Sequence, residues 1–131
     1  MCIRDRIYTS DHGQAFQEGC FMHCTVENPN PREGLVPLFV ATGDERLLAG
    51  FIDGARQSSA HGSHFAIPPT LLKLLGYSTA DIHRVYGASL FERNDEEPAF
   101  TSGNVFALFS EKVQWHRLDL TRSYVEPGTR P

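Results

Sequence analysis

The sequence has no dense run of lysine or arginine and no apolar stretch long enough to cross a bilayer. Its formal net charge is −4 at pH 7, whereas nucleic-acid binding draws on a concentrated positive surface that displaces counterions from phosphates. A transmembrane helix needs about 20 mostly apolar residues, and no charged-then-apolar leader opens the chain. We therefore expect no nucleic-acid partner, no membrane-spanning segment and no export signal in this chain itself.

Cysteine is also scarce, with three in 131 residues. Cys20 and Cys24 lie on either side of His23. A disulfide between these two cysteines would close a small loop and would fit an oxidising compartment. Alternatively, the three residues are a fragment of a structural zinc site, although no second cysteine pair completes four ligands. Both interpretations stay open at this point.

The first six residues, Met-Cys-Ile-Arg-Asp-Arg, resemble translated sequencing adapter at the start of a broken metagenomic reading frame. We set residues 1–6 aside as a non-native leader. An upstream domain is then expected to be missing from this chain.

Aromatic content and apolar spacing predict a folded α/β chain in the first half. The apolar fraction is 40% and there are nine Phe, whereas disordered chains are poor in aromatic residues. Residues 7–10 are typical of the last turn of a buried strand. The apolar run 35–41 predicts a strand buried on both faces of a parallel or mixed sheet. Residues 44–57 have helical spacing, weakened by Gly50 and Gly54.

The second half predicts two short helices and a hairpin. Residues 67–76 favour a short helix, with Leu71 to Leu75 in the core and Gly76 as its stop. Ser78 or Thr79 could cap another turn through Val85. The segments 100–109 and 113–120 indicate an antiparallel hairpin, with Trp115 packed against the sheet. Residues 121–131 are expected to be a loose tail.

The sharpest local feature is Asp11-His12-Gly13, a carboxylate beside an imidazole where a strand is predicted to end. Ligands collect outside the carboxyl ends of strands in α/β sheets. Neighbouring side chains of an extended strand point to opposite faces, so both could reach one ion only if the backbone turns there. Gly13 makes such a turn inexpensive.

Four motifs in this order resemble the C-terminal half of sulfatases and phosphoethanolamine transferases, members of the alkaline-phosphatase superfamily: Tyr8 to Gly13, His23, Leu35 to Leu38, and Ser63-His64 ahead of Pro69 to Gly76. The resemblance covers residues 7–91, with a weaker match at 87–91. It implies an α/β fold, the C-terminal part of an alkaline-phosphatase-like mixed sheet flanked by helices and followed by a β-hairpin. Residues 7–120 would form part of the catalytic domain.

The resemblance also implies site residues. Asp11 and His12 correspond to the pair that binds the catalytic metal. His23 corresponds to a histidine that contacts the transferred group or a second ion. His64 matches a histidine before the short helix in several members. The nucleophile lies far upstream in relatives, so no catalytic nucleophile is assigned in this chain.

An imidazole ligand favours zinc or manganese over calcium, so we expect a divalent metal, zinc first, with manganese or calcium as alternatives. Thr9, Ser10 or Gln14 could hold His12 in one tautomer. The expected substrate is a phosphate or sulfate ester, including a lipid headgroup. The resemblance implies a parent protein on the periplasmic or extracellular face, anchored in the inner membrane.

Two departures from the family leave the subfamily open. Gln14 stands where many relatives have Glu, and Cys24 where they have Gly. Neither substitution removes a proposed ligand. They do leave undecided whether the acceptor is a lipid headgroup, a glycan or water.

Other interpretations remain. The fold could belong to a non-catalytic binding or regulatory module, or Asp11-His12 could be structural in an unrelated α/β domain. His61 and His64 could be ordinary loop histidines, and His83 and His116 fit structural roles.

Overall fold

The computed structural model describes residues 5–16, 28–58, 61–103 and 113–121. Within these residues the protein is a mixed α/β chain with three α-helices and two small antiparallel sheets. The prediction that the chain combines helices with strands is therefore confirmed, but the described sheets are antiparallel, not parallel or mixed. The elements, in chain order, are β1 (Arg6–Thr9), η1 (Pro31–Gly34), β2 (Leu38–Ala41), α1 (Glu45–Gln57), η2 (His64–Ala66), α2 (Ile67–Leu74), α3 (Thr79–Val85), β3 (Ala99–Ser102) and β4 (Gln114–Arg117).

The chain divides into two compact units. One, the helical unit, consists of Met1–Tyr8 and Leu38–Glu96. The other, the hairpin unit, consists of Thr9–Pro37 and Glu97–Pro131. Arg6, assigned above to the non-native leader, is the first residue of β1.

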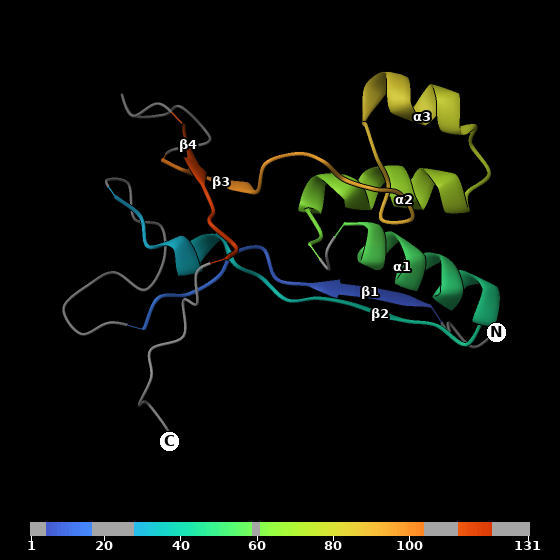
Figure 1. Cartoon of the computed structure of the whole chain (residues 1–131), viewed down its shortest axis with the longest axis horizontal. Coiled ribbons are helices and arrows are strands. Elements are labelled where there is room, and N and C mark those ends of the chain that lie inside the picture. The colour runs from blue at the N-terminus through green and yellow to red at the C-terminus, as the bar shows by residue number, and fades with distance from the viewer. Residues whose placement is uncertain (1–4, 17–27, 59–60, 104–112, 122–131) are drawn as a thin grey trace. The chain divides into compact units, whose positions relative to one another are not determined.

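In the helical unit, α1 lies along the two-stranded sheet of β1 and β2 (Figure 1). The helix begins where the sequence predicts, because the Asp44 side chain accepts hydrogen bonds from the backbone N–H of Arg46 at 2.8 Å and of Leu47 at 3.1 Å. These donors have no partner within the helix itself. The predicted helix 44–57 is confirmed, with Asp44 as its cap.

Replacing this cap tests how much it stabilises the helix. We expect Asp44→Ala to lower the free energy of unfolding by about 1 kcal/mol, since two backbone donors lose their acceptor. Urea unfolding followed by far-UV circular dichroism measures this, because all three described α-helices belong to the helical unit. Asp53→Ala is the matched control, because Asp53 lies in the same helix and forms an exposed ion pair with Arg56. An equal loss in both variants would contradict the capping role.

The two later helices also begin and end where local signals predict. Gly76 has a φ of 90° just after α2, a conformation that favours glycine. The Ser78 side chain accepts from the backbone N–H of Asp81 at 3.2 Å and caps α3. The short helix 67–76 and the turn through Val85 are therefore confirmed.

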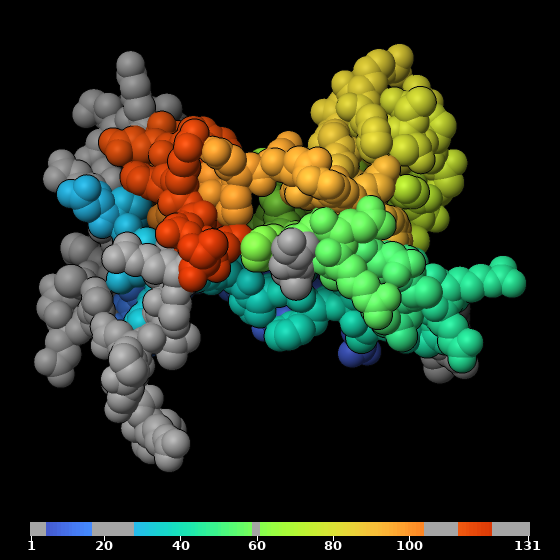
Figure 2. All heavy atoms as spheres, in the orientation of Figure 1, coloured from blue at the N-terminus to red at the C-terminus, as the bar shows by residue number. Residues whose placement is uncertain are grey.

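The prediction that Leu71 to Leu75 lie in the core is wrong for this chain. Leu71 and Leu74 are each 48% exposed, and Leu75 is 75% exposed. The buried residues of this helix are instead Pro69 and Thr70, in its first turn. Figure 2 shows α3 and the segment before it, in yellow, at the surface of the molecule.

The run 35–41 forms a strand only from Leu38 onwards, and it is not buried on both faces. Its residues alternate between half-buried and exposed, and Phe39 is 61% exposed beside the ring of Tyr8. Within the described residues one helix covers this sheet, so a single face is packed. The expectation of a doubly buried strand was wrong here.

In the hairpin unit, β3 and β4 pair antiparallel, with Phe100 opposite His116. The predicted C-terminal hairpin is confirmed in these strands. Trp115 does not pack as predicted, because it is 63% exposed. It occupies the same strand as His116, whose ring lies 5.3 Å from that of Phe100. Neighbouring side chains of a strand point to opposite faces. His116 lies on the face that packs against Phe100, so Trp115 lies on the exposed face. Residues 104–109 of the predicted hairpin and 122–131 of the predicted tail lie outside the described residues.

Candidate functional site

The backbone turns directly after β1, at the Asp11-His12 pair. The strand ends at Thr9, and a bend follows at Asp11 and His12. The Ser10 hydroxyl donates to the His12 carbonyl at 2.8 Å, which stabilises this bend. The strand end predicted from the sequence is therefore present, together with the turn that the pair requires.

His12 is held in a defined tautomer. Its Nδ1 lies 2.9 Å from the carbonyl oxygen of Gly13. A carbonyl only accepts hydrogen bonds, so Nδ1 is the donor and a neutral ring carries its lone pair on Nε2. Metal-binding histidines in proteins are commonly oriented by such a bond at the other nitrogen. The hydrogen-bond partner of His12 Nδ1 is therefore the main chain of Gly13, and not the side chain of Thr9, Ser10 or Gln14 as the sequence suggested.

The two side chains approach one another. His12 Nε2 lies 3.8 Å from Asp11 Oδ1. Two ligands of one tetrahedral zinc ion, each about 2.0 to 2.2 Å from the metal, lie about 3.3 to 3.6 Å apart. The observed separation of 3.8 Å is slightly longer, so a small rotation of the exposed Asp11 side chain would bring both atoms onto one ion. The side chain of Asp11 is 87% exposed and that of His12 40% exposed, so solvent reaches both.

Asp11 carries negative charge at neutral pH. Its own backbone N–H and the neighbouring His12 lower the pKa of its carboxyl group below the ordinary value. A carboxylate and a neutral imidazole form a donor set that suits zinc or manganese.

The remaining two candidate residues are His23 and His64. His23, with Cys20 and Cys24, lies outside the described residues. His64 begins η2 in the helical unit, after Ser63, which caps that turn. Across the described ranges of the chain, no group of three or more His, Cys, Asp or Glu could hold a metal ion.

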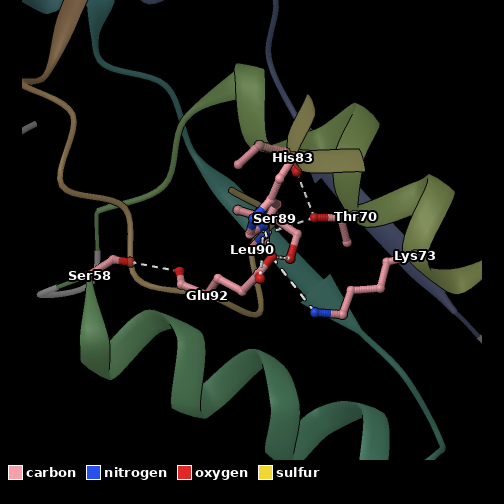
Figure 3. A network of polar contacts seen from close by, with 8 residues as sticks. Ser58, Thr70, Lys73, His83, Ser89, Leu90 and Glu92 are labelled. Atoms are coloured by element: carbon pink, nitrogen blue, oxygen red, sulfur yellow. Dashed lines mark hydrogen bonds and ion pairs between the residues drawn. The ribbon is translucent and has the colours of Figure 1, made fainter. Parts of the chain in front are cut away.

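A separate polar cluster lies in the helical unit and centres on Glu92 (Figure 3). One carboxylate oxygen accepts from the Ser89 hydroxyl and, at 3.0 Å, from the Ser89 backbone N–H. Lys73 of α2 lies 3.7 Å from the same oxygen. His83 of α3 lies 3.0 Å from the other oxygen. Glu92 therefore connects α2, α3 and the 89–92 turn.

The electrostatics of this cluster favour the ionised carboxylate. Burial raises the pKa of Glu92, but the hydrogen bonds from Ser89 and His83 and the charge of Lys73 outweigh burial and lower the pKa to about 2. Thr70 completes the cluster: its fully buried hydroxyl donates to the Ala66 carbonyl at 2.6 Å and accepts from the Leu90 N–H at 2.8 Å.

Sequence reasoning missed this cluster. The spacing Ser89-x-x-Glu92 is that of a capping box, in which the glutamate accepts from the backbone of the serine, and this signal could have been found. The participation of Lys73 and His83 could not have been predicted, because these residues lie in α2 and α3, distant in sequence from Glu92.

The helical unit also contains a cavity of about 260 Å³ between β2, α1 and the 89–94 segment. Its walls are mostly apolar, and Asp11 and His12 are not among them. The lining residues are Leu38, Val40, Leu48, Phe51, Ile52, Gly54, Ala55, Ser58, His61, Gly62, Ser63, Ala66, Ser89, Leu90, Glu92 and Asn94.

Comparison of the chain with models of known protein families, with curated proteins and with solved structures found no match. The resemblance to sulfatases therefore stays an interpretation of the motifs. Among the helices that the structure describes, none combines the length and apolarity needed to span a bilayer.

Proposed function

We propose that this chain carries part of the metal site of a hydrolase or transferase that acts on phosphate or sulfate esters. The observation that carries the proposal is the Asp11-His12 pair at the end of β1, with the two donor atoms 3.8 Å apart. The motif order described above supports the phosphoethanolamine-transferase-like branch of the alkaline-phosphatase superfamily. An alkaline-phosphatase-like mixed sheet, completed by upstream sequence, belongs to the same proposal.

Asp11 and His12 would be two of the ligands of a divalent metal, with zinc as the expected ion. Such an ion would act as a Lewis acid that stabilises negative charge on the oxygens of the transferred group. The bond from His12 Nδ1 to the Gly13 carbonyl leaves Nε2, 3.8 Å from Asp11 Oδ1, as the nitrogen that would bind the metal. His23 would face the transferred group or a second ion, and the nucleophile would come from upstream sequence.

The substrate proposed for this site is a phosphate or sulfate ester, with a lipid headgroup as one form. The upstream nucleophile discriminates between them: threonine favours phosphoryl transfer, and a cysteine or serine in a formylglycine motif favours sulfate ester hydrolysis. The proposed location is the periplasmic or extracellular face, in a parent protein anchored to the inner membrane.

Zinc binding by the purified chain tests the proposal. We expect isothermal titration to detect a zinc site whose affinity falls about tenfold or more in Asp11→Asn and in His12→Gln, because each change removes a ligand. His61→Gln is the matched control, since His61 is an exposed histidine in the helical unit. Zinc binding that is equally strong in all variants, or absent from the wild-type chain, would refute this metal site. A non-catalytic module with a degenerate site would give the second result.

The proposal also predicts that the isolated chain has no esterase activity. The isolated 131-residue chain should not hydrolyse p-nitrophenyl phosphate or p-nitrophenyl sulfate above the rate of buffer containing zinc, because the proposed nucleophile lies outside it. A colorimetric assay with zinc and manganese measures this. Hydrolysis that survives in His12→Gln would point to a contaminant, whereas hydrolysis abolished by His12→Gln would overturn the statement that the nucleophile is missing.

A further inference from the structure

The η1 turn, Pro31–Gly34, is closed by a reciprocal pair of side chains. The Asn30 side chain accepts from the Arg32 N–H at 3.0 Å, and the Glu33 carboxylate accepts from the Asn30 N–H at 3.1 Å. This is a capping box, an arrangement that satisfies backbone donors at both positions. Glu33 is 9% exposed, so its side chain is held within the hairpin unit.

This turn holds the backbone next to His12. The Gly13 N–H donates to the Glu33 carbonyl at 2.8 Å. Gly13 is buried, and a Cβ atom added to it would overlap the carbonyl oxygens of Arg32 and Leu35. The peptide that follows His12 is therefore fixed against η1 by a hydrogen bond and by close packing.

The hairpin supports the turn from the other side. A Cβ atom added to Gly34 would overlap the ring of Phe100 in β3, so ring and backbone are in direct contact. That ring in turn lies beside His116 of β4. A continuous set of contacts thus joins the hairpin, η1 and Gly13, all within the hairpin unit.

We propose that the Asn30–Glu33 capping box positions the metal-binding side of His12, acting through Gly13. The Gly13 carbonyl accepts a hydrogen bond from His12 Nδ1. The N–H of Gly13 donates to the backbone carbonyl of Glu33, whose side chain closes the capping box. Fixing Gly13 fixes the acceptor, and the acceptor fixes the tautomer that places a lone pair on Nε2. The metal-binding part rests on the proposed function, whereas the effect on the tautomer does not. Asn30 and Glu33 are positioning residues and need not touch the metal.

The tautomer of His12 can be measured without metal. Two-bond ¹H–¹⁵N NMR correlation spectra, recorded well above the ordinary imidazole pKa of about 6.5, distinguish the two neutral forms, and loss of peaks in His12→Gln identifies the signals. We expect the wild-type ring to be protonated at Nδ1. Glu33→Ala should give a mixture of both forms. Glu33→Gln should restore the wild-type pattern, because its amide oxygen can still accept from Asn30.

His116 serves as the internal control. Its Nε2 lies 2.7 Å from the Ser102 hydroxyl in the hairpin of the same unit, so its signals report whether that unit remains folded. A change at His12 with His116 unchanged supports the inference. A wild-type mixture, or a His12 pattern unaffected by Glu33→Ala, would overturn it. If His116 also changes, the milder Glu33→Asp decides, since its side chain is one methylene shorter and weakens the bond to the Asn30 N–H: an unaltered His12 would then reject the positioning role.

Zinc titration separates this inference from the function on which its metal part rests. We expect the affinity to fall about tenfold in Glu33→Ala and to recover in Glu33→Gln, as for other residues that orient a metal ligand. Absence of zinc binding with a tautomer that still depends on Glu33 would reject the metal site and keep the positioning role. Zinc binding that requires His12 but is indifferent to Glu33 would keep the metal site and reject the positioning role.

Discussion

Replacing Glu92 by Gln should destabilise the helical unit at neutral pH by up to about 3 kcal/mol. The pKa of about 2 in the folded protein lies below the ordinary value of 4.5, and a tenfold change in a proton-binding constant corresponds to about 1.4 kcal/mol. The carboxylate side chain is 24% exposed, so solvent screens it only in part. Its loss weakens the contacts with Ser89, His83 and Lys73 together.

The pH dependence has a definite sign. Because the pKa is lower in the folded protein than in the unfolded chain, the contribution of Glu92 is fully present above about pH 4.5 and is lost as the pH falls towards about 2. The wild-type chain should therefore lose stability across this window, and Glu92→Gln should lack that part of the loss. Urea unfolding followed by far-UV circular dichroism at a series of pH values measures both.

Glu96→Gln is the control for Glu92→Gln. Glu96 belongs to the same unit but its side chain is exposed, so we expect a change below about 0.5 kcal/mol. Fluorescence of Trp115, the single tryptophan, reports on the hairpin unit independently. A Glu92→Gln protein that is as stable as wild type at pH 7 and unfolds along the same acid profile would refute the role assigned to the cluster.

Gly54→Ala should be the second strongly destabilising change, with a net loss of about 2 kcal/mol. Gly54 is buried in α1, and an added Cβ would overlap the Leu90 carbonyl and lie 2.9 Å from Phe91 Cα. Both are backbone atoms, so relief requires α1 and the 89–92 turn to separate. Overpacking of this kind costs about 1 to 3 kcal/mol or more, which outweighs the gain of about 1 kcal/mol from alanine in a helix.

Gly50→Ala is the matched control in the same helix. Its added Cβ would lie 3.2 Å from Phe91 Cδ1, a side-chain atom that can shift. We expect a stability between wild type and about 1 kcal/mol above it. Urea unfolding followed by the helical signal compares the two variants. If Gly54→Ala proves as stable as Gly50→Ala, the close contact between α1 and Leu90 is not present in solution.

The helix limits were predictable because their causes are local. Asp44 and Ser78 accept hydrogen bonds from N–H groups two or three residues further along the chain, and Gly76 ends α2 through its own φ angle. Each signal lies within one helical turn of the boundary that it sets. Sequence spacing is sufficient for such contacts, since chain connectivity already brings the partners together.

Burial was predicted less well, because it depends on which side of an element meets the rest of the fold. The apolar pattern of α2 favoured Leu71 to Leu75 as core, but the helix turns Thr70 inward to bond Leu90, twenty residues away. By helix propensity Gly54 weakens α1, whereas the contact with Leu90 requires a residue without a side chain. Neither partner can be identified from local sequence.

The candidate site also has one part that local sequence predicts and one part that depends on distant residues. The sequence by itself determined that a carboxylate and an imidazole follow the end of a strand, with a glycine to turn the chain, because these are properties of adjacent residues. Only the tertiary structure decided which nitrogen of His12 carries the proton, since the Gly13 carbonyl that sets it belongs to a residue held by Glu33, twenty residues further on. Hydrogen bonds between distant segments exist only once the chain has folded, and they select one orientation from those that the local backbone allows.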